Sequence, residues 1–166
     1  MARVIMIPLF LILLYLDFEY SNYIAMGIFI IAGLTDLADG IVARKRNQVT
    51  DFGKFMDPLA DKVLTFAAML WFIEIGLMPA WLVLIVIIRE FMVTGMRLVA
   101  AAKGTVIAST MFGKIKTTVT VCALILMFLP LHEWMLVSCW VLIGITTVGS
   151  GIECFVKNKE IMKLDK

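Results

Sequence analysis

The chain is built from long apolar runs separated by short polar connections. Six runs come close to the roughly 20 residues that a helix needs to cross a bilayer. They span residues 3–17, 22–44, 55–76, 79–101, 113–129 and 134–156. Because the connections are short, neighbouring helices should be antiparallel and packed together. The pattern predicts an all-α polytopic integral membrane protein, with six transmembrane helices in a single domain over residues 1–166.

Composition strengthens this interpretation. Hydrophobic residues make up 62% of the 166 residues, and the mean hydropathy is +1.00. A soluble domain averages roughly 45–50% apolar residues, so a soluble globular protein is excluded as a class. The first apolar run is followed by further runs, which excludes a cleaved signal peptide.

The basic residues predict the orientation of the chain. Lys and Arg cluster around residues 44–62 and 97–116 and again in the C-terminal tail. The other connections carry acidic residues and one histidine, but neither Lys nor Arg; they are residues 17–21, 74–79 and 130–134. By the positive-inside rule, the basic connections and both chain termini face the cytoplasm.

Four aspartates at the edges of two apolar runs are the strongest chemical feature. They are Asp36, Asp39, Asp57 and Asp61. A carboxylate in the middle of a spanning helix costs roughly 2.5–3.5 kcal/mol, so such residues are usually functional. On helices the first pair is spaced i, i+3 and the second i, i+4, so two facing helices bring four carboxylates together. Carboxylates so close repel one another, and their oxygen ligands suit Mg²⁺ or Mn²⁺.

A simpler alternative is that these aspartates are interfacial acids paired with neighbouring cations. The cations in reach are Arg44, Lys45, Lys54 and Lys62.

The third helix should begin near Phe55 and hold Pro58 in its first turn, where a missing N–H costs nothing. Asp57 and Asp61 would then lie at the positive end of the helix dipole.

The spacing of the acids carries a resemblance. The residues read D-x-x-D-G-x-x-A-R, then eight residues, then G-x-x-x-D-x-x-x-D. This resembles the signature of the CDP-alcohol phosphatidyltransferases. All eight motif positions are matched, by Asp36, Asp39, Gly40, Ala43, Arg44, Gly53, Asp57 and Asp61.

The resemblance implies a site and a reaction. Two divalent cations, Mg²⁺ or Mn²⁺, would be held by the four aspartates, and Asp61 would also act as general base. The CDP-diacylglycerol pocket would be lined by Gly40, Ala43, Arg44 and Gly53. The resemblance further implies a homodimer in the bacterial plasma membrane, with the active site facing the cytoplasm. No nucleic-acid partner is expected.

A second polar group lies in the fourth and fifth apolar runs. One interpretation is a packing ion pair between Arg89 and Glu90, with the nearby lysines as membrane anchors. The other is a pocket for an anionic acceptor. The run REFMVTGMRLVAAAKGTVIAS, followed by GKIKT, resembles the branch of the family that transfers the phosphatidyl group to sn-glycerol 3-phosphate. On that resemblance the glycerol phosphate would be bound by Arg89, Thr94, Arg97, Lys114 and Lys116.

Two alternatives for the function stay open. A sibling enzyme would use another acceptor: phosphatidylglycerol, serine or inositol phosphate. A divalent-cation transporter would use the aspartates as its ion site, although a transporter should carry polar residues toward both membrane faces and here they gather at one face.

The family also carries a short interfacial segment before the Arg that Arg3 matches, and this chain begins almost at that Arg. We therefore expect a form that lacks the segment.

Overall fold

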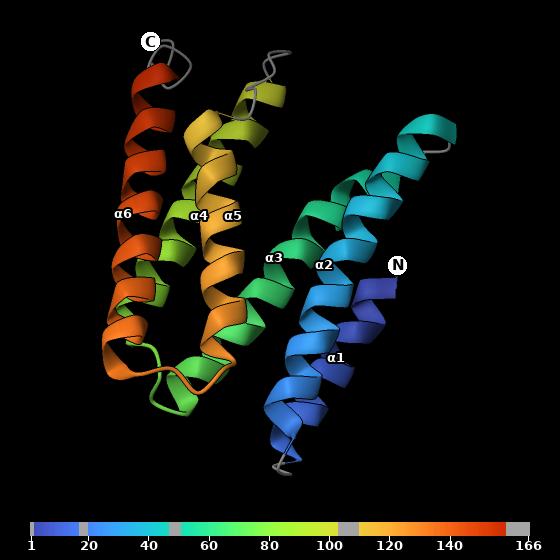
Figure 1. Ribbon diagram of the computed structural model, residues 1–166. Helices are drawn as coiled ribbons and strands as arrows, with labels where there is room; N and C mark the ends of the chain where they lie inside the picture. The colour runs from blue at the N-terminus through green and yellow to red at the C-terminus, as the bar shows by residue number, and fades with distance from the viewer. Residues whose placement is uncertain (1, 17–19, 47–50, 103–109, 159–166) are drawn as a thin grey trace. The chain divides into compact units, whose positions relative to one another are not determined.

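The computed structural model describes residues 2–16, 20–46, 51–102 and 110–158, with side chains described over residues 6–16, 20–35, 62–101 and 110–158. The described residues form six α-helices and no strand, which confirms the all-α prediction. The helices are α1 (Ala2–Tyr15), α2 (Ser21–Arg46), α3 (Asp51–Glu74), α4 (Ala80–Ala102), α5 (Met111–Met127) and α6 (Glu133–Lys157) (Figure 1). Each helix overlaps one of the six apolar runs.

The chain divides into two compact units. The first comprises Met1–Ile75 and Ile125–Pro130, and the second comprises Gly76–Leu124 and Leu131–Lys166. In the first unit α1 packs against both α2 and α3, which also contact each other (Figure 1). In the second unit α4 packs along α6. The boundary at Gly76 is a tight turn, since this residue has a φ of 74°, a left-handed conformation that glycine adopts without strain after a helix.

Four phenylalanines form the centre of the first unit. Phe10, Phe29 and Phe72 come from α1, α2 and α3, and Phe128 comes from the segment after α5; all four are buried. The ring centroids of Phe72 and Phe128 lie 4.8 Å apart, and Phe128 lies 6.1 Å from both Phe10 and Phe29. These distances are typical of interacting aromatic pairs. Phe128 therefore ties residues 125–130 to the three N-terminal helices.

The helix α6 is apolar over most of its surface. Its buried residues recur every three or four positions and are Leu136, Cys139, Ile143, Thr147, Ser150 and Cys154. Most of the exposed positions between them are also apolar, including Val141, Ile145, Val148 and Ile152. A surface helix of a soluble protein would carry polar residues there. In the described part of the chain, α6 is the helix long and apolar enough to cross a membrane.

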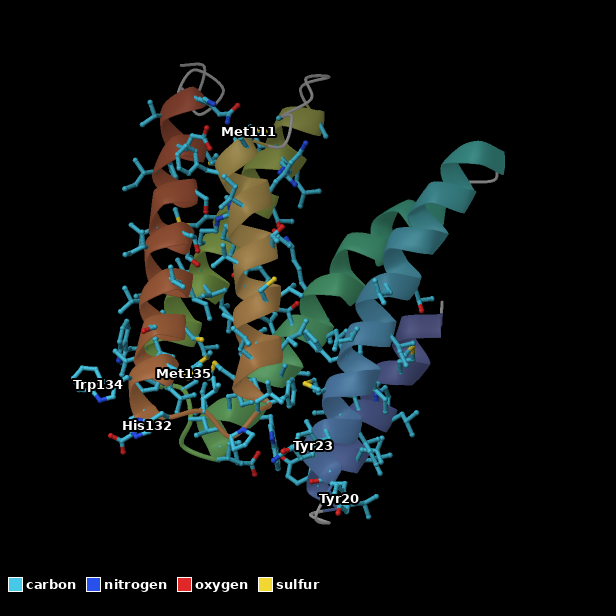
Figure 2. The ribbon with its side chains drawn as sticks, viewed as in Figure 1. Tyr20, Tyr23, Met111, His132, Trp134 and Met135 are labelled. Carbon is cyan, nitrogen blue, oxygen red and sulfur yellow. The ribbon has the colours of Figure 1, made fainter. Side chains whose placement is uncertain are left out.

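Aromatic residues occupy two helix starts. Tyr20 and Tyr23 lie at the beginning of α2 and are exposed. Trp134 begins α6 and points away from it, with 80% of its surface exposed (Figure 2). Amphipathic rings at helix ends are typical of the boundary between membrane and water.

The number of transmembrane helices stays a prediction. The helix α5 is shorter than α6, and the helix α4 carries charged residues, so neither has both the length and the apolar composition that qualify α6 to cross a membrane.

Candidate functional site

The acid motif lies on two neighbouring helices. Asp36 and Asp39 are in the C-terminal half of α2, and Asp57 and Asp61 are in the N-terminal half of α3. These helices contact each other within the first unit. The side chains of residues 36–61 lie outside the described part of the structure. The backbone therefore brings the two halves of the motif onto adjacent helices, and the convergence of the carboxylates stays a prediction.

The other motif positions follow on the same helices. Gly40 directly follows Asp39 on α2, Ala43 and Arg44 lie about one turn further along, and Gly53 lies in the first turn of α3. Between the two helices the chain runs only through residues 47–50, which lie outside the described residues. A connection this short keeps α2 and α3 neighbours.

The predicted start of the third helix was wrong. The helix α3 begins at Asp51, four residues before Phe55. Pro58 is therefore beyond the first turn, inside the helix, where its ring removes a backbone hydrogen bond. The helix dipole acts mainly within the first turn, so Asp57 and Asp61 are too far along α3 to be stabilised by it as expected.

The motif aspartates are the predicted metal ligands of this chain. Where side chains are described, no group of three or more His, Cys, Asp or Glu residues is close enough together to bind a metal ion. The motif aspartates lie outside that part. Their chemistry fits a hard divalent cation, because four carboxylates on two contacting helices offer only oxygen ligands.

A polar cluster joins α4 to α5 in the second unit. One oxygen of Glu90, Oε1, accepts hydrogen bonds from Arg89 Nη1 and from Lys116 Nζ, each at 2.7 Å. The side chain of Lys116 is only 6% exposed, and those of Arg89 and Glu90 are each 13% exposed. Charged groups with so little access to water require partners. The predicted ion pair between Arg89 and Glu90 is thus confirmed, while the pairing of Lys116 was missed.

The predicted acceptor residues fall into two groups. Arg89 and Lys116 are held by Glu90 in the interior, whereas Arg97 and Lys114 are exposed and Thr94 is half-buried. All five belong to α4 and α5 in the second unit. The signal that Lys116 would find a partner was available in the sequence, since Glu90 is the only acidic residue of α4 and an acid in an apolar helix is rarely unpaired.

Two glycines lie beside the Arg89 side chain, and sequence reasoning did not identify them. A Cβ atom on Gly151 of α6 would lie 3.4 Å from Arg89 Cγ, and one on Gly113 of α5 would lie 3.7 Å from Arg89 Nη2. The side chain therefore extends between three helices. It also lines a groove of about 330 Å³ with apolar residues of α4 and α6. Arg89 Nε has no hydrogen-bond partner in the described part of the chain.

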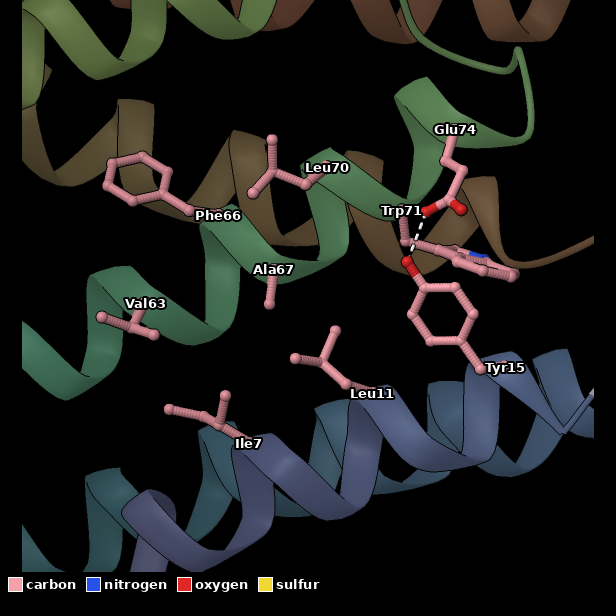
Figure 3. A pocket seen from close by; sticks show the side chains of 9 residues that line it. All are labelled: Ile7, Leu11, Tyr15, Val63, Phe66, Ala67, Leu70, Trp71 and Glu74. Atoms are coloured by element: carbon pink, nitrogen blue, oxygen red, sulfur yellow. Dashed lines mark hydrogen bonds between the residues drawn. The ribbon is translucent and has the colours of Figure 1, made fainter.

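A separate groove of about 430 Å³ lies between α1 and α3. Its lining is apolar along most of its length, from Ile7 and Val63 at one end (Figure 3). At the other end the Tyr15 hydroxyl donates a 2.6 Å hydrogen bond to Glu74 Oε2, and the Tyr15 ring meets Trp71 edge-on. Of the predicted site residues whose side chains the structure describes, none lines this groove.

Comparison with known proteins decides the family. The family model described as CDP-alcohol phosphatidyltransferase matches residues 1–148 of this chain. The chain belongs to the CDP-alcohol phosphatidyltransferase family. The resemblance carried by the acid motif is thereby confirmed, and the protein is a transferase enzyme. Family membership also argues against the cation transporter that the aspartates alone left open.

Several members of the family are similar along most of their length. A Bacillus subtilis (strain 168) protein is 43% identical over 182 aligned positions, covering 98% of this chain and 94% of the relative. Relatives from Haemophilus influenzae and Salmonella typhimurium are 43% and 39% identical, each covering 74% of this chain and 68% and 69% of their own lengths. All three are named CDP-diacylglycerol–glycerol-3-phosphate 3-phosphatidyltransferase.

Proposed function

We propose that this protein transfers the phosphatidyl group of CDP-diacylglycerol to sn-glycerol 3-phosphate, giving phosphatidylglycerophosphate and CMP. The observation that carries the proposal is the 43% identity, over nearly the full length of both chains, to a Bacillus subtilis protein named for this reaction. The complete family motif on α2 and α3 supports it. The names of the relatives favour glycerol 3-phosphate over phosphatidylglycerol, serine or inositol phosphate as acceptor.

In this proposal the motif residues hold the nucleotide lipid. Asp36, Asp39, Asp57 and Asp61 bind two divalent cations, Mg²⁺ or Mn²⁺, and the contact between α2 and α3 supports a shared site. When bound, such ions neutralise charge on the diphosphate and on the departing CMP. Gly40, Ala43, Arg44 and Gly53 line the CDP-diacylglycerol pocket. The missing side chain of Gly40 allows a close approach to the backbone of α2, and Arg44 offers a forked donor to a phosphate.

Asp61 acts as general base in the transfer. It takes the proton of the primary hydroxyl of the acceptor, and that oxygen attacks the phosphorus that carries diacylglycerol. The bond from this phosphorus to the CMP oxygen breaks, and CMP leaves with the electron pair. A carboxylate within hydrogen-bond reach of the hydroxyl is suited to this role. No covalent lipid–enzyme intermediate is required, because no Ser, Cys or His lies within the acid motif itself.

The acceptor phosphate binds to the basic residues of α4 and α5. Arg89, Thr94, Arg97, Lys114 and Lys116 form the proposed site, in which Arg97 and Lys114 are the exposed cations. Guanidinium and ammonium groups bind phosphate oxygens through short charge-assisted hydrogen bonds. The burial of Lys116 beside Glu90 supports cations whose positions are fixed before the acceptor binds.

We further propose a multi-pass arrangement in the bacterial plasma membrane. Six transmembrane helices would place both chain termini and the active site at the cytoplasmic side, and the acyl tails of the lipid substrate would stay in the bilayer. The apolar exposed positions of α6 and the exposed aromatic residues at two helix starts support contact with lipid. A homodimer is also proposed from family resemblance.

The proposed reaction is tested by CMP release from purified protein. We expect release with CDP-diacylglycerol, Mg²⁺ or Mn²⁺ and glycerol 3-phosphate, and only background release when the acceptor is omitted. Phosphatidylglycerol, serine and inositol phosphate serve as competing acceptors in parallel reactions. Release with one of these but not with glycerol 3-phosphate would retain the enzyme class and contradict the acceptor.

Removing divalent cations is expected to lower the rate by about 100-fold or more, because several kcal/mol of charge stabilisation in the transition state would be lost. CMP release is measured after treatment with EDTA and again after readdition of Mg²⁺, Mn²⁺ or Ca²⁺. Restoration by Mg²⁺ or Mn²⁺ is expected. A rate unaffected by exhaustive chelation would contradict the proposed use of the four aspartates.

Replacing Arg97 with Gln is expected to raise KM for glycerol 3-phosphate about tenfold, because one charge-assisted hydrogen bond to phosphate is lost. KM for CDP-diacylglycerol should change little. The matched control is Lys157→Gln, which removes an exposed cation of α6 outside the proposed site. Equal changes in both KM values would show that Arg97 acts on the whole fold and not on the acceptor.

A further inference from the structure

Glu90 is a buried acid for which the acid motif and the acceptor set give no role. Its carboxylate oxygen Oε1 accepts from two cations at the same distance, 2.7 Å, and one of them, Lys116, comes from another helix. The two nitrogen atoms share this oxygen and therefore lie no more than about 5.4 Å apart, twice the distance of 2.7 Å. Two like charges at that separation repel each other, and the shared carboxylate offsets the repulsion.

Burial restricts how the two cations can move. The side chain of Arg89 is 13% exposed and that of Lys116 is 6% exposed. A flexible lysine loses rotamer freedom when it is held in one position. Because Glu90 is bonded to both, it fixes their positions relative to each other before any ligand is bound.

Arg89 still offers hydrogen-bond donors. A guanidinium has five N–H donors, and Arg89 gives one of its terminal nitrogens, Nη1, to Glu90, so one carboxylate oxygen satisfies only part of the capacity of this side chain. Arg89 Nε has no partner in the described part of the chain. Preset donors stabilise an incoming anion without the cost of ordering them during binding.

We propose that Glu90 is a positioning residue for the acceptor: it holds Arg89 and Lys116 in the arrangement that receives the phosphate of glycerol 3-phosphate. This inference rests on the proposed function, since it assigns the two cations to the acceptor site. Glu90 itself does not touch the substrate, because a carboxylate and a phosphate repel each other. The competing interpretation is an ion-pair cluster that only fixes the packing of α4 against α5.

The two interpretations differ in what they predict for the kinetic constants. A positioning residue affects KM for glycerol 3-phosphate selectively, since Arg89 and Lys116 would be displaced while the CDP-diacylglycerol site is unchanged. A packing residue affects the stability of the protein, and its replacement lowers kcat without a selective change in KM for glycerol 3-phosphate. Glu90→Gln keeps the shape of the side chain and removes its charge, and Glu90→Asp keeps the charge and withdraws it by one methylene.

The experiment measures kcat and both KM values, with the midpoint of thermal unfolding, for the full chain and both variants in the same detergent. We expect Glu90→Gln to raise KM for glycerol 3-phosphate at least tenfold and KM for CDP-diacylglycerol less than twofold. Glu90→Asp should have an intermediate KM, a partial rescue by the retained charge. The matched control is Glu153→Gln, which removes another acid paired with a lysine, at 2.6 Å, within the second unit.

Each outcome distinguishes the proposals. If the wild type is active and the variants leave KM for glycerol 3-phosphate unchanged, the positioning role is contradicted and the proposed function is not affected. A parallel loss of kcat and of the unfolding midpoint supports the packing interpretation. If Glu90→Gln does not fold, Glu90→Asp decides, with a severalfold rise in KM expected and no rise contradicting the role. A wild type that does not use glycerol 3-phosphate contradicts the proposed function itself, and the inference with it.

Discussion

Replacing Asp61 with Asn is expected to lower glycerol-3-phosphate-dependent CMP release by about 10²- to 10⁴-fold, the usual contribution of a general base. Asn has nearly the same shape as Asp but cannot accept the proton of the attacking hydroxyl. It also removes one negative charge from the proposed metal ligands. The measurement is kcat at saturating concentrations of both substrates and of Mg²⁺ or Mn²⁺, compared with the wild type.

The control for Asp61 is Asp51→Asn, which changes an aspartate of the same helix α3 outside the motif. This variant should retain activity within about twofold, since Asp51 is not one of the eight motif positions. Thermal unfolding of both variants excludes a general loss of folding. Activity near the wild-type level in Asp61→Asn would contradict the general-base role and leave Asp61, at most, a dispensable metal ligand.

Replacing Phe128 with Ala is expected to destabilise the protein by about 3–5 kcal/mol, the usual cost of truncating a buried Phe. Phe128 packs against Phe10, Phe29 and Phe72 with ring centroids 4.8 to 6.1 Å away. Its removal leaves a cavity lined by three rings that belong to three different helices. The measurement is the midpoint of thermal or denaturant unfolding of the purified protein in detergent.

The control for Phe128 is Phe112→Ala on α5, where the Phe side chain is 56% exposed. This variant should change stability by less than about 1 kcal/mol in detergent, because little buried packing is lost. Similar unfolding midpoints for the two variants would show that the four-phenylalanine cluster does not hold residues 125–130 to α1, α2 and α3.

The helices could be predicted because their signals are local. The run of apolar residues from 134 to 156 corresponds to α6, and Gly76 lies in the turn after α3, where the pattern predicts the end of that helix. The start of α3 could not be read in the same way. Asp51 and Gly53 are polar or small and suit a turn, yet the helix includes both, because local propensity is weak compared with packing against neighbouring helices.

The candidate site was predictable to different degrees in its two parts. The acid motif is a fixed pattern within 26 positions, so it indicates the family without tertiary information. The family match confirms the family, while the roles of the motif residues stay predictions. The resemblance predicts five acceptor residues on α4 and α5, and the sequence does not indicate which of them are buried. The structure separates them, because Arg89 and Lys116 share a carboxylate while Arg97 and Lys114 are exposed.

By itself, the sequence determined the class of the protein, the approximate ranges of its helices and its family. Those properties depend on the length of apolar runs, on composition and on the spacing of residues close in sequence, all of which can be read without knowing how the helices pack. Only the tertiary structure decided that Glu90 binds Lys116, 26 residues away, and that Phe128 joins the three N-terminal helices. Such contacts depend on how helices cross and rotate against one another, and many arrangements share the same apolar pattern.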